Sequence, residues 1–547
     1  MIIDLKKLIN PTNKKDYAIS FFLAAIIAII TAPVIDGLAF FALGNTSVGT
    51  WYNKYWLVFF FVCAFVPLSA VILRNHLCDK PEKIYLIIIL CTSLLFSWST
   101  GVSTYSWDDG THYRNTLILN DFDESVEFST SEFEQINTNR QKNETIIKNI
   151  YDREFELNYF SNDVAQIINV DKESISFLYP KIAYLPSAII MCLCDFFGLS
   201  FSTTFVLSKM AIALCYSLIT YFGMKKLITG KMLYAIIALL PTAVFLASNY
   251  SYDWWVNAFV LYAFATLAGI IQDDSQKISV LQALTIPLLI IVGSLPKLVY
   301  VPLAILCILI PKERFKTKKD KYIFRSIILG IPIILAIALI IYLAINPIFI
   351  SSILGAGDTR GGSNVNPSAQ LEYILSNPLS YLQSIITFLM PPIGHDAIGN
   401  TISGMLSPGG LKEVFTHYAY LGILPKYYCA AIMALLLFTI LTDKKREISY
   451  KRGTWIFPLI IVTIILIAII SALYLSFTGV GSHEIHGVQG RYLIPLLFPL
   501  FIWLGTSRLA IANKSETTMA IYNGSILTIM FIILMSSWWI MYIAYIY

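Results

Sequence analysis

Two adjacent carboxylates, Asp108 and Asp109, follow directly after an apolar run of the chain. Because like charges this close repel each other, the pKa of one carboxyl rises and that group becomes a competent proton acceptor. A nearby cation such as Arg114 would keep the other carboxyl ionised. The alternative is structural, since aspartate is a common N-terminal cap of helices. The acidic pair therefore indicates either a general base or a helix cap.

A second polar segment ends in Arg491, at the start of a late apolar run. Two glycines flank Gln489, and glycine lets the backbone approach a ligand closely. An arginine at this position places a forked cation at the depth of phosphate headgroups. The alternative is an arginine that reaches lipid headgroups without a further role. His483 and His486 lack a third ligand nearby in the sequence, so we predict no metal site.

Further polar residues stand between apolar runs. Asp253 adjoins Trp254 and could hold a sugar that stacks on the indole, although an aromatic belt at the membrane interface explains the tryptophans equally well. Lys297 is either a second phosphate contact or an interface anchor. Arg360, in a long polar loop, is a further candidate cation. A transporter would instead place its ionisable groups near the bilayer midplane.

Apolar segments must position all these residues, because the chain is 57% hydrophobic and 13% charged, with a mean hydropathy of +0.68. That composition excludes a water-soluble enzyme. The net charge of +5 comes from short basic clusters between apolar runs, which report membrane orientation and do not indicate a nucleic-acid partner. The eight cysteines indicate no disulfide framework. About thirteen spans are predicted, near residues 18–43, 55–73, 84–104, 203–223, 232–249, 252–271, 278–294, 298–311, 323–346, 418–441, 454–476, 491–511 and 520–546.

Charge distribution sets the topology of these spans. With the N-terminus inside, alternate connections collect most of the lysines and arginines. Counting 183–197 as a span would reverse two basic clusters, so we interpret it as a juxtamembrane or re-entrant helix. The first long external loop is expected to form a cap of short amphipathic helices. The predicted organisation is a two-span extension at 1–83 and a membrane domain at 84–547, with extracytoplasmic loops at 105–202 and 347–417.

Four short motifs, taken in the order in which they occur along the chain, resemble those of a bacterial membrane family of GT-C-like glycosyltransferases, long labelled a domain of unknown function. The resemblance covers most of the chain after the two N-terminal spans. One position departs from it, because Asp109 stands where the family usually has glutamate. The matching residues are Asp108, Asp109, His112 and Arg114; Tyr252 and Asp253; Pro296, Lys297 and Tyr300; and Gly487, Gln489, Gly490, Arg491 and Tyr492.

The resemblance implies an all-α polytopic GT-C bundle and a sugar donor linked to polyprenyl phosphate. Transfer would occur on the outer face of the bacterial cytoplasmic membrane, to a cell-envelope glycan or glycopolymer. The implied base is Asp108, with Asp109 as second choice, and a single carboxylate acting on the acceptor favours inversion. No cofactor is required, and the need for a divalent metal stays open. Donor phosphate contacts are predicted at Arg491, Lys297, Arg360 and His486, and substrate contacts at His112, Arg114, Tyr252, Asp253, Trp254, Tyr300, Gln489 and Tyr492.

Three other functions are compatible with many spans and external cations. A polysaccharide polymerase or ligase is one alternative, although the acidic pair that opens the first large loop argues against it. A flippase or transporter of lipid-linked sugars would move its substrate without forming a glycosidic bond. A membrane scaffold would not depend on Asp108 or Arg491.

Overall fold

The computed structural model describes most of the apolar segments and part of the external loops. Arg360 and residues 390–407 lie outside the described part of the chain. The described residues are 11, 13–43, 54–101, 106–120, 125–129, 167–171, 179–273, 275, 277–345, 361–362, 364–389, 408–443, 454–504 and 515–542.

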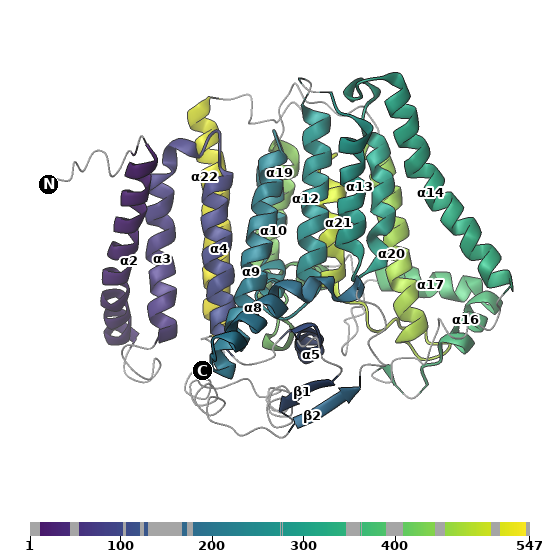
Figure 1. The fold of residues 1–547 in the computed structure, drawn as a ribbon, viewed down its shortest axis with the longest axis horizontal. Coiled ribbons are helices and arrows are strands. Elements are labelled where there is room, and N and C mark those ends of the chain that lie inside the picture. Colours follow the sequence, from purple (N-terminus) through teal and green to yellow (C-terminus); the bar gives the residue numbers. More distant parts are fainter. Residues whose placement is uncertain are drawn as a thin grey trace.

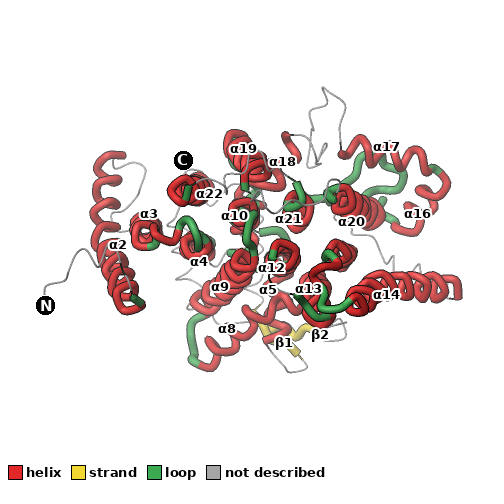
Figure 2. The backbone as a smooth tube through the Cα atoms, turned by 90° about the horizontal axis from the view of Figure 1, so that it is seen from above, coloured by secondary structure: helices red, strands yellow, loops and turns green. Residues whose placement is uncertain are grey.

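Long helices stand side by side and form the body of the molecule (Figure 1). Seen along their axes the bundle is elongated, with α2 at one edge, α14 at the other, and α9, α10, α12 and α21 between them (Figure 2). The long helices are α2 (Lys14–Leu43), α3 (Lys54–Ile72), α4 (Glu82–Ser99), α9 (Phe201–Lys226), α12 (Asp253–Gln272), α13 (Val280–Ser294), α14 (Lys318–Ile345), α19 (Lys426–Thr442), α20 (Ile456–Ser476) and α22 (Glu516–Tyr542).

Six described helices are long and apolar enough to cross a bilayer, so the chain is a multi-pass membrane protein. Shorter apolar helices pack among them, and the figure of about thirteen spans stays a prediction. The six qualifying segments are Lys14–Ile35, Glu82–Ser99, Ser202–Lys226, Asp253–Gln272, Ile456–Ser476 and Glu516–Met541.

Several predicted spans are not single α-helices. The predicted span 232–249 divides into α10 (Lys231–Ala238) and α11 (Pro241–Leu246), because a proline ring cannot continue a helix and favours its first turn. Proline also lies within η4 (Leu298–Leu309), a 3₁₀ helix where a span at 298–311 was predicted. The predicted span 491–511 begins with the 3₁₀ turn η8 (Gly490–Leu493), which leads into α21 (Ile494–Phe501).

The first external loop contains strands as well as helices, so the prediction of a cap built from helices was wrong in part. β1 (Ser125–Ser129) pairs antiparallel with β2 (Ile167–Asp171). Helix α5 (Asp109–Asn120) precedes the strands, and η3 (Tyr179–Tyr184) and α8 (Leu185–Phe196) follow them. These elements lie across one end of the upright helices (Figure 1). At 12 residues α8 is too short to cross a bilayer of about 30 Å, which agrees with a juxtamembrane helix.

The remaining described elements are short. The predicted span 418–441 contains the 3₁₀ turn η7 (Ala419–Leu421) before α19, which begins at Lys426 directly after Pro425. The central core is formed by α10, α11 and the middle of α12, whose apolar side chains are almost completely buried. The short elements are η1 (Arg74–His76), η5 (Lys312–Arg314), α16 (Pro367–Ser376), α17 (Pro378–Leu389), α18 (Pro408–Phe415) and η7 (Ala419–Leu421).

The connections between helices gather at two opposite ends of the bundle. At one end, Gln272 Oε1 accepts hydrogen bonds from the backbone of Ile228 and Thr229, and Gly230 N donates to Asp443 O. Basic residues of the α9–α10 and η5–α14 connections lie at this end, which agrees with the predicted grouping of basic connections on one side. Asp253 opens α12 at the other end, roughly 30 Å from Gln272 at 1.5 Å per helical residue.

Candidate functional site

Arg491 forms the centre of an ionic cluster at the end of the bundle that carries α5. Its Nη2 lies 3.8 Å from Asp108 Oδ2, and its Nη1 lies 3.3 Å from Asp253 Oδ2. The side chains of Arg491 and Asp253 are 2% and 6% exposed, whereas that of Asp108 is 33% exposed. One buried guanidinium therefore joins a buried carboxylate to a carboxylate that solvent can reach.

Lys297 brings a second cation to the same cluster. Its Nζ donates to Asp253 Oδ1 at 2.6 Å and lies over the rings of Tyr492 and Tyr252, at 3.8 and 4.9 Å from their centroids. Cation–π contacts of this kind hold a partly desolvated ammonium in place. Asp253 thus shares its two oxygens between Lys297 and Arg491 and keeps both cations side by side.

The two adjacent aspartates have different surroundings. Asp108 adopts a left-handed backbone with φ of 54°, which is costly for a residue other than glycine, and its carbonyl accepts from His112 N. Asp109 is 1% exposed, and its Oδ2 accepts a hydrogen bond from Ser106 N at 3.3 Å. Asp109 therefore fixes the turn before α5, while Asp108 faces the cluster.

A buried histidine lies beside the cluster. A 2.6 Å hydrogen bond joins His112 Nδ1 to the hydroxyl of Tyr184, and the Tyr252 ring packs edge-on at 4.7 Å. Burial lowers the pKa of the His112 imidazole to about 4, so the ring is neutral near pH 7. His112 consequently adds no charge to the site and positions Tyr252, which faces Lys297.

Local backbone packing fixes the position of Arg491. A Cβ atom on Gly490 would lie 2.5 Å from the backbone of Glu413, so glycine lets η8 lie directly against α18. Gly487 has φ of 82° and packs against the Phe477 ring. Tyr300, buried in η4, donates its hydroxyl hydrogen to the carbonyl of Tyr492 at 2.8 Å. The Gly-x-Gln-Gly-Arg-Tyr motif is therefore built for close contacts on both of its sides.

Some buried polar atoms of the cluster have no hydrogen-bond partner among the described residues. They include Nε and Nη1 of Arg491, Oδ2 of Asp253 and Oε1 of Gln489. The ion pair between Arg491 and Asp253 partly compensates the cost of burying their charges. These atoms nevertheless make no hydrogen bond of good geometry to a described residue. These atoms are donors and acceptors that a polar ligand or water could satisfy.

Not every predicted site residue belongs to the cluster. The Trp254 side chain is completely buried in the core beside Trp255. His486 donates its backbone N–H to Thr478 Oγ1, and among the described residues no hydrogen bond or ion pair joins its ring to the cluster. Arg360 and the side chain of Arg114 lie outside what the structure describes. Among the described residues there is no group of three side chains suited to a metal ion.

Three residues that the sequence did not indicate form a chain of contacts leading away from Arg491. The Trp107 ring lies 4.5 Å from the Arg491 guanidinium and 4.8 Å, edge to face, from the His417 ring. His417 pairs through Nδ1 with Glu413 Oε2, four residues earlier. The signal in the sequence was weak, because a Glu-His pair at this spacing is an ordinary helical pair.

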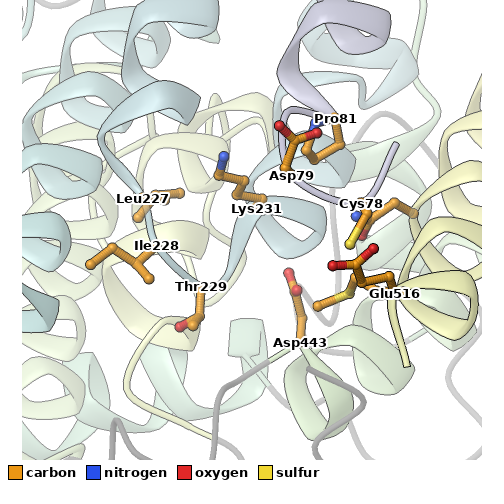
Figure 3. Close-up of a pocket in the computed structure, with 11 residues that line it drawn as sticks. Cys78, Asp79, Pro81, Leu227, Ile228, Thr229, Lys231, Asp443 and Glu516 are labelled. Carbon is orange, nitrogen blue, oxygen red and sulfur yellow. The ribbon is translucent and has the colours of Figure 1, made fainter. Parts of the chain in front are cut away.

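The opposite end of the bundle contains a cavity of about 440 Å³ (Figure 3). Its wall includes Lys231, Asp443 and Glu516. Lys231 Nζ donates to Glu82 Oε2 at 2.7 Å, and Asp443 Oδ2 accepts from the backbone N–H groups of Met232 and Leu233 at 2.6 and 2.9 Å. Lys231 and Asp443 therefore serve the packing of α10 and are already paired.

The fold and the cluster define a polytopic helical membrane protein with a buried ionic site at one end of its bundle. Residues 102–500 match the family described as "Predicted membrane protein (DUF2142)". The chain belongs to this family, and the matched region contains every member of the ionic cluster, while α2, α3 and α4 precede it. No curated protein and no solved structure matches the chain.

Proposed function

We propose that this protein is a GT-C-like membrane glycosyltransferase that moves a sugar from a polyprenyl-phosphate donor to a cell-envelope acceptor. Its site would lie on the extracytoplasmic face of the bacterial cytoplasmic membrane, because the α9–α10 and η5–α14 connections, which are basic in sequence, lie at the other end of the bundle (Figure 1). The observation that carries the proposal is the placement of Arg491 between partly exposed Asp108 and buried Asp253, with Lys297 beside it.

The proposed reaction is a single displacement at the anomeric carbon. Asp108 accepts the proton of an acceptor hydroxyl, and the oxygen attacks the anomeric carbon as its bond to the donor phosphate breaks. The polyprenyl phosphate leaves with the bonding electron pair. One carboxylate acting on the acceptor, without a covalent intermediate, inverts the anomeric configuration.

The same residues couple proton transfer to the stabilisation of the leaving group. In the resting site the Arg491 guanidinium lies 3.8 Å from the Asp108 carboxylate and favours its ionised, proton-accepting form. Once Asp108 has taken the proton it is neutral and attracts Arg491 less strongly. Nη2 of Arg491 is then available to the phosphate at the moment when negative charge develops there.

Asp253 would act by positioning and not by accepting protons. Its carboxylate pairs with both Lys297 and Arg491, so two cations stay close together in a buried site. Two adjacent cations suit the phosphate of a lipid-linked donor, and no nucleotide-binding domain is needed because the leaving group is already a lipid phosphate.

The test is a transfer assay with purified protein in lipid vesicles. The donors are polyprenyl phosphates carrying glucose, galactose, mannose or arabinose, and the acceptor is isolated cell-envelope glycan. We expect Asp108→Asn to lose transfer by about 10²- to 10⁴-fold, the usual contribution of a positioned base. Asp109→Asn should mainly lower the thermal stability, because Asp109 holds the turn at Ser106.

Matched controls separate chemistry from folding. Glu372 is exposed on α16, so Glu372→Gln should transfer sugar at the wild-type rate. Full activity of both aspartate variants would overturn the assignment of the base. Movement of a lipid-linked sugar across the vesicle membrane, without a new glycosidic bond, would replace the transferase with a flippase.

A further inference from the structure

Trp107 lies between two residues that come from distant parts of the chain. On one side its ring meets the Arg491 guanidinium at 4.5 Å, and on the other it receives the His417 ring edge-on at 4.8 Å and 87°. Trp107 is 8% exposed, so both contacts are largely shielded from water. The indole is therefore clamped between a cation and an imidazole.

His417 is itself held in place from two directions. Its Nδ1 pairs with Glu413 Oε2 in the last turn of α18, and its backbone N–H donates to Thr242 Oγ1 at 2.9 Å. His417 lies two residues after the end of that helix, in an isolated bridge with Ile423. Glu413 belongs to α18, whose backbone is close enough to η8 that a Cβ on Gly490 would collide with it. The helix that carries Glu413, the partner of His417, is thus fixed directly against the 3₁₀ turn that carries Arg491.

Asp108 needs such support, because its backbone conformation is unfavourable. A φ of 54° lies in the left-handed region, which aspartate adopts less readily than glycine, and it persists where surrounding contacts enforce it. Trp107 is the preceding residue, so the orientation of its side chain constrains the peptide that leads into Asp108. The clamp on Trp107 and the strain at Asp108 are adjacent features of one turn.

We propose that Glu413 and His417 are positioning residues that hold Trp107 against Arg491 and thereby fix the Asp108 carboxylate opposite the guanidinium. This inference rests on the proposed transferase function. Neither side chain transfers a proton in the reaction: His417 acts by its edge-to-face contact with Trp107, and Glu413 acts by orienting the imidazole.

Substitutions that keep or remove the aromatic ring test this mechanism. In the vesicle assay His417→Ala should lower kcat by about 10- to 100-fold, because a small displacement of a reacting group is costly. The KM for the donor should change little, since Asp253 still holds Arg491. His417→Phe restores an aromatic edge without a titratable nitrogen and should recover most of kcat. Glu413→Gln keeps an acceptor oxygen and should fall between the two.

The controls distinguish this inference from the proposed function. His483 is exposed in the segment before η8, and His483→Ala should behave as wild type. Melting curves verify that each variant is folded before its kcat is interpreted. Wild-type transfer together with full activity of His417→Ala would overturn the positioning role alone, as would a folded His417→Phe that is as inactive as His417→Ala. Absence of transfer by the wild-type protein with every donor would overturn the proposed function.

Discussion

At the end of the bundle that carries η8, the Arg491 guanidinium shares two carboxylates at 3.3 and 3.8 Å. At the opposite end, the Asp443 carboxylate accepts two backbone hydrogen bonds at 2.6 and 2.9 Å. Both regions are buried and charged. In the first region, several polar atoms lack a hydrogen bond among the described residues. In the second region, the carboxylate of Asp443 accepts hydrogen bonds from the free N–H groups at the start of α10.

Whether buried polar atoms are already hydrogen-bonded distinguishes a candidate binding site from a structural contact better than cavity volume does. The opposite end has a cavity of about 440 Å³, lined in part by Lys231 and Asp443 (Figure 3). Lys231 is nevertheless already paired with Glu82, and Asp443 accepts hydrogen bonds from the first turn of α10. A ligand there would have to displace contacts that the fold needs. At the Arg491 end, a phosphate would add hydrogen bonds to donors that have none.

The largest expected effect on stability is at Asp253. Asp253→Asn removes the charge that Lys297 and Arg491 share, and leaves two buried cations facing each other. Loss of one partner from a buried ion pair typically costs about 3–5 kcal/mol. The midpoint of thermal unfolding in detergent should therefore fall clearly, and transfer should fall with it.

The melting temperature of Asp253→Asn also tests whether shared charge holds the cluster together. If Asp253→Asn melts at the wild-type temperature, the repulsion between Lys297 and Arg491 does not destabilise the fold. The Asp253 carboxylate would then not be what holds the two cations together. Added polyprenyl phosphate should restore part of the melting temperature of this variant, because a bound anion replaces the missing carboxylate. The exposed Glu372→Gln serves as the control for a general loss of charge.

Sequence reasoning could find the members of the cluster because their types are unusual in apolar surroundings. Asp108, Asp253, Lys297 and Arg491 each follow or precede an apolar run, and alternate spans bring such positions to one end of a bundle. The structure does bring these four together. It also separates Asp108 from Asp109 by burial, a difference that depends on a backbone turn and not on residue type.

Other features could not be obtained from pattern alone. The break between α10 and α11 is marked by Pro241, but the run of apolar residues around it hides the break. The pairing of β1 with β2 joins segments that are far apart in the sequence, and no periodicity reports such a contact. The contact of His417 with Trp107 is equally non-local, since about 300 residues of chain separate them.

A smaller effect is expected at the opposite end of the bundle. Asp443→Ala removes the cap of α10 and should destabilise the protein by about 2 kcal/mol, near the upper value for such caps. Asp443→Asn keeps an acceptor oxygen and should cost less. Because this end is structural, kcat of the folded variant should equal that of wild type. A lower kcat without a lower melting temperature would mean that Asp443 takes part in the reaction. The two ends of the bundle would then not differ in the way proposed.

The smallest effect needs no mutation and concerns His112. Burial lowers the pKa of its imidazole from 6.5 to about 4. The neighbouring carboxylates of Asp253 and Asp108 raise this pKa, and the cations Arg491 and Lys297 lower it. Between these pH values the unfolded chain binds a proton that the folded protein excludes, so stability is complete above pH 6.5 and falls as the pH drops toward 4. One pH unit below 6.5 the loss is about 1.4 kcal/mol.

Thermal melting of wild type and His112→Gln between pH 7.5 and 5 measures this loss. Glutamine can keep a hydrogen bond to the Tyr184 hydroxyl but does not titrate, so the variant should lose part of the pH dependence while melting lower than wild type at pH 7.5. Identical slopes for the two proteins would mean that His112 does not titrate differently on folding.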